Sequence, residues 1–249
     1  MAGCTGPRLS TRHATLKLGD VTVEVQQKDI KHLHLSVYPP AGKVRISAPL
    51  RMKLDTVRVY AISKLAWIRQ QQRKLRAQER ESPREYVDRE SHYVWGRRCL
   101  LNVVAVEAAP AVKLRHTRLT LQVRPGASRE HKQAVVAQWY RDQIKAAVPA
   151  LLSTWEPRLR VKAEHAFVQK MRTKWGSCNP SARNIRLNTD LAKKPAECLE
   201  YVLVHELVHL LEPTHSARFV ALMDRHLPDW AHRRKALNAL PVRHEDWGY

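Results

Sequence analysis

The sequence predicts an α+β protein: a β-rich N-terminal half with one long basic helix, then a second half that combines helices with a small sheet. Apolar and polar residues alternate over 14–50 and again over 86–124, which is typical of half-exposed strands. Between these stretches, and after residue 128, apolar residues recur with the helical period. We expect a flexible tail at 1–13, a β-rich domain at 14–125 and a second domain at 126–249.

The first strands are expected within residues 14–50. Val21, Val23 and Val25 alternate with polar residues, and a turn at 39–42 leads into a further alternating run. One polar face per strand is typical of an antiparallel sheet with one side in solvent.

A long helix is expected from about Leu54 to Arg80. Its apolar face contains Val57, Ala61 and Ile68, which recur with the helical period. A basic face of this kind can bind a phosphate backbone or a membrane surface. It can also be a solvated surface without a partner, and the pattern does not distinguish these alternatives. The cations of this face are Lys53, Arg58, Lys64, Arg69, Arg73, Lys74, Arg76 and Arg80.

Strands resume between residues 86 and 124, and the Pro125-Gly126 pair marks the expected join to the second domain. A helix is expected from Ser128 onward, with Val136, Tyr140 and Ile144 on its apolar face. Pro149 lies in this helix and is expected to kink or shorten it. The sequence shows no internal repeat.

The composition excludes several classes of protein. The 44 Lys and Arg against 23 Asp and Glu leave a net charge of +21, which attracts polyanions. A hydrophobic content of 44% excludes a disordered chain, and 8 Gly exclude a collagen-like one. Four scattered cysteines without a C-x-x-C pair favour a reducing, cytoplasmic compartment. No apolar run suits a signal peptide or a membrane-spanning helix, so no membrane partner is expected.

The segment V-L-V-H-E-L-V-H-L-L-E-P-T-H, residues 202–215, indicates a metal site. On a helix, His205 and His209 lie one turn apart on the same face and can bind one metal ion. Glu206 lies near enough to act as general base on water in such a site. His215 follows a turn at Pro213 and can supply a third nitrogen. Three nitrogens with an open position are typical of catalytic zinc sites.

Two alternatives to this ligand set remain open at this stage. Some zinc hydrolases take the third ligand from a carboxylate on a later helix, and Asp224, Asp229 and Glu245 are candidates here. The metzincins share the histidine spacing but have Gly where this chain has Glu212, and no Met-turn is visible. Three imidazoles suit zinc, and also nickel or cobalt, and disfavour magnesium.

A basic hairpin is expected directly before this motif, with its turn at residues 179–182. If it borders the metal, the cleft is positive and favours anionic substrates. The alternative is a basic edge strand that resists aggregation. Trp175 is expected in the core or on the rim of the cleft. The candidate substrate-binding residues are Arg172, Lys174, Trp175, Arg183 and Arg186, together with Arg218 after the motif.

Several of these motifs together resemble the YgjP-like metallopeptidase family, a relative of the SprT-like and WLM zincins. They are M-R-T-K-W-G-S-C (171–178), N-I-R-L-N (184–188) and V-H-E-L-V-H-L-L-E-P-T-H-S-A-R-F (204–219), with further similarity at R-I-S-A-P (45–49) and K-L-A-W-I (64–68). The resemblance implies a minimal zincin core of a helix, a small sheet, the H-E-x-x-H helix and a further helix. It also implies His205, His209 and His215 as zinc ligands and Glu206 as general base.

The expected function is therefore that of a metal-dependent hydrolase. By resemblance to this family the substrate is either a peptide or a nucleoside triphosphate, since some members are described as splitting UTP to UMP and diphosphate. The cations around residues 170–194 suit a triphosphate. The alternative is a nucleic-acid-associated SprT-like protein with a metal site, although no nucleic-acid-binding motif is present.

Overall fold

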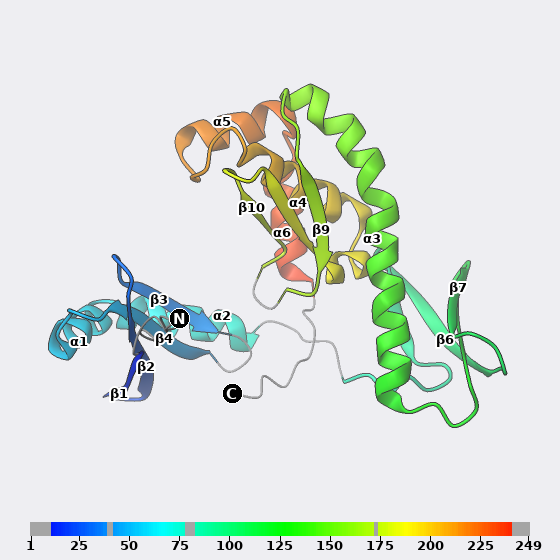
Figure 1. The fold of residues 1–249 in the computed structure, drawn as a ribbon, viewed down its shortest axis with the longest axis horizontal. Helices are drawn as coiled ribbons and strands as arrows, with labels where there is room; N and C mark the ends of the chain where they lie inside the picture. Colours follow the sequence, from blue (N-terminus) through cyan, green and yellow to red (C-terminus); the bar gives the residue numbers. More distant parts are fainter. Residues whose placement is uncertain (1–10, 39–41, 78–82, 172–173, 241–249) are drawn as a thin grey trace, which may run out of the picture. The chain divides into compact units, whose positions relative to one another are not determined.

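The computed structural model describes residues 11–38, 42–77, 83–171 and 174–240. The chain forms two compact units, residues 1–81 with 244–249, and residues 82–243. Helices and strands are both present in each unit, as Figure 1 shows, which confirms the predicted α+β class.

Unit 1 begins with a four-stranded sheet whose strand order is β1-β2-β4-β3. Its strands are β1 (Arg12–Leu18), β2 (Val21–Lys28), β3 (His34–Tyr38) and β4 (Lys43–Pro49). The prediction of an antiparallel sheet is wrong for one pair of strands. Strand β4 lies between β2 and β3, and it runs parallel to β2. Alternation reports which face is buried, and it carries no information about strand direction. Residues 1–10 of the expected tail lie outside the described residues, whereas Arg12 and His13 belong to β1.

The expected basic helix consists of two helices, α1 (Leu54–Ser63) and α2 (Leu65–Ala77). The ladder is interrupted at Lys64, whose N–H donates to Ala61 in place of the carbonyl four residues back. The Ser63 hydroxyl donates to the Tyr60 carbonyl at 2.8 Å, so a side chain competes for the backbone acceptors at this point. Arg80 lies outside the described residues.

Unit 2 begins with a second four-stranded sheet, of strand order β5-β6-β8-β7. Its strands are β5 (Ser91–Val94), β6 (Arg97–Ala105), β7 (Ala111–Arg115) and β8 (Arg118–Val123). The outer pairs are antiparallel and the central pair β6–β8 is parallel, as in unit 1. The two sheets therefore share one topology, although no repeat is visible in the sequence.

The expected domain boundary near Pro125-Gly126 falls inside unit 2. Helix α3 (Arg129–Leu159) begins after Ser128 as expected, and it continues through Pro149 instead of ending there. Buried side chains of the β5–β8 sheet, of α3 and of the later elements form one hydrophobic cluster. Burial of this shared apolar surface joins the sheet to the second half of the chain, whereas unit 1 has a cluster of its own.

The rest of unit 2 consists of a three-stranded sheet and four short helical segments. The strands β9 (His165–Gln169), β10 (Gly176–Asn179) and β11 (Asn184–Asn188) have the order β10-β11-β9. The expected hairpin is the antiparallel pair β10–β11, with β10 at the edge of the sheet. The segments η1 (Thr189–Lys193), α4 (Ala196–Val208), α5 (Ala217–His226) and α6 (Trp230–Ala239) follow.

None of the helices in the described part of the chain combines the length and apolar character that a bilayer-spanning helix requires. Cys99, Cys178 and Cys198 are free thiols.

Candidate metal centre

Helix α4 positions His205, Glu206 and His209. It follows Pro195, which suits a helix start because its ring sets φ in advance and it has no N–H to satisfy. Leu199, Val202, Leu203 and Leu207 are buried, so hydrophobic burial holds the helix in the unit 2 core. His209 is the residue that ends the helix.

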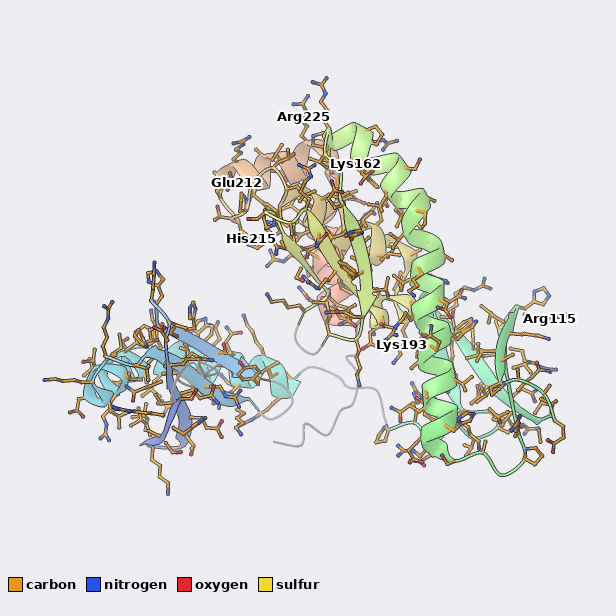
Figure 2. The ribbon with its side chains drawn as sticks, in the orientation of Figure 1. Arg115, Lys162, Lys193, Glu212, His215 and Arg225 are labelled. Carbon is orange, nitrogen blue, oxygen red and sulfur yellow. The ribbon has the colours of Figure 1, made fainter. Side chains whose placement is uncertain are left out.

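The chain then turns and brings His215 back toward α4. In this turn the Thr214 hydroxyl donates to the Glu212 carboxylate at 2.7 Å. Ser216 caps α5 by accepting the Phe219 N–H. Figure 2 shows His215 and Glu212 beside α5. Lys193 precedes the N-terminal end of α4.

The three predicted histidines converge. One nitrogen from each of His205, His209 and His215 lies within 4.8 Å of the other two. The Nε2 atoms of His205 and His215 are 3.0 Å apart. The Nδ1 atom of His209 lies 3.1 Å from the Glu212 carbonyl oxygen, so Nδ1–H donates there and Nε2 is the nitrogen left for a ligand.

Phe219 of α5 supports this cluster from the buried side. Its ring lies 4.9, 4.7 and 4.8 Å from the rings of His205, His209 and His215, and its side chain is 1% exposed. Packing against one rigid aromatic ring limits the orientations of all three imidazoles.

The surroundings of His205 and His209 favour their neutral form. Burial, then the neighbouring His209 and His215, lower the pKa of His205 to about 3. Burial also lowers the pKa of His209. Neutral imidazole is the form that binds a metal ion, so the site favours the ligating state at physiological pH.

Glu206 lies beside the histidines and is 5% exposed. Burial raises the pKa of its carboxyl group to about 8, against the opposing effect of Lys174. Gly176 of β10 packs directly against this side chain, since a Cβ atom there would lie 2.6 Å from Glu206 Oε1. The edge strand and the carboxyl group are therefore in close contact.

The histidines open onto a cleft of about 520 Å³. Strand β10 forms part of its wall, and the predicted residues Lys174 and Trp175 lie on its lining. Trp175 also packs against the unit 2 core, so its side chain meets both expectations, the core and the rim of the cleft. Other residues on its lining are Ser177, Cys178, Tyr201, Arg234 and Asn238.

Three of the predicted cations, Arg183, Arg186 and Arg218, do not line this cleft. The Arg183 guanidinium donates to the Lys162 carbonyl, and the Arg186 guanidinium lies over the Phe167 ring at 5.8 Å. Alternate residues of a strand point to opposite faces, which sequence spacing near the motif does not reveal. Arg218 lies on the exposed surface of α5 near Glu212. Arg172 lies outside the described residues.

Sequence reasoning missed three residues of the site. The side chain of Asn188 binds the backbone of Met171 and Lys174 and so holds the segment that leads into β10. Tyr201 lies one turn before His205, and this spacing of four residues was a usable signal. Arg234 comes from α6, and no local pattern connects it to the motif.

The alternative third ligands are engaged elsewhere or undescribed. Asp224 accepts the Trp230 indole N–H at 2.7 Å, and Asp229 pairs with Arg233. Glu245 lies outside the described residues. Among the residues that the structure describes, the histidine trio is the group assembled for a metal ion.

The comparisons with known proteins agree with this geometry. The model of the family described as YgjP-like, metallopeptidase domain, matches residues 31–240. The chain belongs to the YgjP-like metallopeptidase family. The match confirms the resemblance seen in the motifs, and a metal-dependent hydrolase with a divalent metal is what this family implies.

Two solved structures resemble parts of this YgjP-like chain. The metallopeptidase zymogen abylysin of Pyrococcus abyssi is 20% identical, with a TM-score of 0.34 over 39% of this chain and 99% of abylysin. The metallopeptidase zymogen jannalysin of Methanocaldococcus jannaschii is 17% identical, with a TM-score of 0.33 over 36% of this chain and 92% of jannalysin. A search of curated proteins found no match.

Proposed function

We propose that this protein is a zinc-dependent peptidase in which His205, His209 and His215 hold the metal and Glu206 is the general base. One observation carries the proposal. A buried carboxyl group lines the same cleft as three converging imidazoles and packs against the edge strand of a sheet.

The donor set fits a divalent metal of borderline softness. The buried His205 Nδ1 atom has no hydrogen-bond partner among the described residues, and its Nε2 atom faces the Nε2 atom of His215 at 3.0 Å. Two facing imidazole nitrogens at this distance are well served by a shared cation. Zinc is the preferred ion for three nitrogens, with nickel and cobalt as alternatives.

The residues of the chain have separate roles in hydrolysis. A bound divalent metal supplies Lewis-acid polarisation of the scissile carbonyl group and of water. Glu206 takes a proton from the attacking water on a carboxylate oxygen and gives it to the leaving amine. The Glu212 carbonyl holds the His209 ring in one orientation.

The edge strand supports a peptide as substrate. Within the described sheet β10 pairs with β11 on one side, and Gly176, Ser177 and Cys178 line the cleft. An extended peptide can pair with such an edge through backbone hydrogen bonds, which places its carbonyl groups along the cleft. This recognition needs no particular side-chain sequence.

A nucleoside triphosphate is the second candidate substrate. Lys174 and Arg234 both line the cleft and can pair with phosphate oxygens. The case is weaker than the sequence suggested, because Arg183 and Arg186 have other contacts and do not line the cleft.

The test is zinc-loaded protein incubated separately with unstructured casein and with UTP, using Glu206→Gln as the inactive variant. We expect casein cleavage, and Glu206→Gln should retain the metal while losing at least about 100-fold in turnover. Glu197→Gln is the matched control, because this exposed carboxyl group lies in the first turn of the same helix.

Each outcome separates the alternatives. Diphosphate release from UTP, abolished in Glu206→Gln and without casein cleavage, would replace the peptidase proposal with the pyrophosphatase. Full activity of Glu206→Gln would exclude Glu206 as the general base. Hydrolysis of neither substrate by metal-loaded protein would favour a structural metal site, as in the nucleic-acid-associated alternative.

A further inference from the structure

The helices of unit 1 contain a concentration of positive charge that hydrolysis does not use. Between Leu54 and Ala77 there is one carboxylate, Asp55, and each cation is exposed. The six cations are Arg58, Lys64, Arg69, Arg73, Lys74 and Arg76. Arg69 pairs with Asp20 of the β1–β2 turn at 2.6 Å. Because the fold buries none of these six side chains, their charge is available to a partner.

Helix α2 distributes its residues over three distinct surfaces. The inner surface contains the buried Ile68 and also Gln72, whose amide donates to the Gly42 carbonyl at 2.8 Å. One flank contains three exposed arginines, Arg69, Arg73 and Arg76. Arg73 and Arg76 follow Arg69 by four and seven residues, which places them on the same side of the helix.

The opposite flank and the outermost line of α2 differ in character. Trp67 and Lys74, seven residues apart, share the second flank, and the Trp67 side chain is 42% exposed. Between the two flanks run Ala66, Gln70 and Ala77, which are small or polar. The helix therefore has a slim outer edge with cations on both sides.

We propose that α2 binds duplex DNA, with its outer edge in the major groove. The groove is about 12 Å wide and admits one α-helix. A helix seated there has a phosphate strand on each side, and Arg73 and Lys74 are directed to opposite strands. Gln70 then faces the base edges, where an amide can pair with adenine.

The same surface is a poor match for a membrane. Interfacial helices insert large apolar side chains along their outer face, whereas the outer edge of α2 consists of Ala66, Gln70 and Ala77. A single aromatic side chain on one flank does not make such a face. The DNA proposal is independent of the proposed hydrolysis, because every residue that it uses lies in unit 1.

The test is fluorescence anisotropy of the full chain with a labelled 20-base-pair duplex of mixed sequence, between 50 and 200 mM salt. We expect binding that weakens as salt rises. Arg73→Glu/Lys74→Glu should weaken binding by about tenfold or more at 100 mM salt. The steepness of the plot of log association constant against log salt concentration should decrease by about two.

A matched variant separates this surface from total charge. Lys113→Glu/Arg115→Glu changes the net charge by the same amount at exposed cations of unit 2 (Arg115 is labelled in Figure 2) and should weaken binding by less than about threefold. Arg73→Gln/Lys74→Gln should show the same ranking with a smaller effect, and circular dichroism checks that each variant is folded.

Three results would overturn the proposal. Equal losses in both charge-reversal variants would show that net charge alone drives binding. Tighter binding of the corresponding single strand would exclude the groove. Sedimentation with phosphatidylserine vesicles in the absence of duplex binding would assign the surface to membranes.

Discussion

Gly176 allows the edge strand to contact the carboxyl group of Glu206. A Cβ atom at this position would also lie 2.8 Å from a methyl group of Val202, so one of the neighbours would have to move. Glu206 Oε1 is the nearer atom, at 2.6 Å, and it ends a side chain that has more rotatable bonds than that of Val202. The glycine therefore sets the position of Glu206, the proposed general base, through packing.

We predict that Gly176→Ala lowers the turnover number by about tenfold or more while the zinc content stays near that of the parent protein. Displacement of the Glu206 carboxyl group by even about 1 Å is enough for such a loss. Steady-state kinetics with metal analysis is the measurement. Unchanged turnover in a zinc-loaded, folded variant would contradict the packing argument.

A second residue-scale feature is the buried His92 of β5, which is 3% exposed. Burial lowers its pKa, and Glu90, whose carboxylate lies 3.2 Å from Nε2, opposes this effect only in part. The folded state thus holds the proton less tightly than the unfolded state. The stability that neutral His92 confers is present above its unfolded pKa of about 6.5 and is lost as the pH falls below it.

We predict that His92→Gln makes the free energy of unfolding less sensitive to acid. Between pH 7 and pH 5 the parent should lose more stability than the variant, by at most about 1.4 kcal/mol per pH unit. Urea titrations of metal-free protein at several pH values measure this. His131→Gln, at an exposed position on α3, should leave the parent's slope unchanged, and an identical slope in His92→Gln would refute the assignment.

At the scale of elements, the β5–β6 hairpin docks on the segment that leads into the metal-centre helix. The Trp95 N–H donates to the Ala192 carbonyl at 2.8 Å, and Gly96 lies against Pro195 at the start of α4. A Cβ atom on Gly96 would lie 2.8 Å from Pro195 Cγ. Gly96 also has a φ of +77°, which L side chains rarely adopt.

We predict that Gly96→Ala lowers the free energy of unfolding by about 2–4 kcal/mol, from backbone strain and from overpacking against Pro195. Gly126→Ala is the matched control, because Gly126 has a φ of +74° and open space around it. That variant should lose only the strain, about 1 kcal/mol. Equal losses in urea unfolding would show that the contact with Pro195 has no energetic weight.

The elements differ in how far local patterns predict them. Alternation and the helical period located most strands and the helix at α3, since both depend on neighbouring residues. The break at Lys64 and the parallel pair β2–β4 were not predicted, because a competing hydroxyl and a strand inserted between two others depend on contacts that periodicity does not report.

At the scale of the whole molecule, the two units have separate hydrophobic clusters. All residues of the metal centre lie in unit 2, which extends from residue 82 to 243. We predict that a fragment of residues 82–243 folds cooperatively and binds one equivalent of zinc with the affinity of the full chain. Circular dichroism and zinc titration measure this. A fragment that is unfolded, or that fails to bind zinc, would show that unit 1 is required.

The two four-stranded sheets share their strand order and pairing directions, and each leads into a helical segment. Topology of this kind survives large changes in sequence, because a core position requires only an apolar residue of suitable volume. This explains why comparison of the two stretches of sequence shows no repeat.

The sequence by itself determined the α+β class, the family resemblance and the nearness of His205, Glu206 and His209, because residues one helical turn apart share a face whatever surrounds them. Only the tertiary structure decided which cations enter the cleft. Lys174 and Arg234 line it, whereas Arg183 and Arg186, which are closer to the motif in sequence than Lys174, do not. The reason is physical: strand faces and helix packing direct side chains by long-range burial, which the spacing of charges along a chain does not encode.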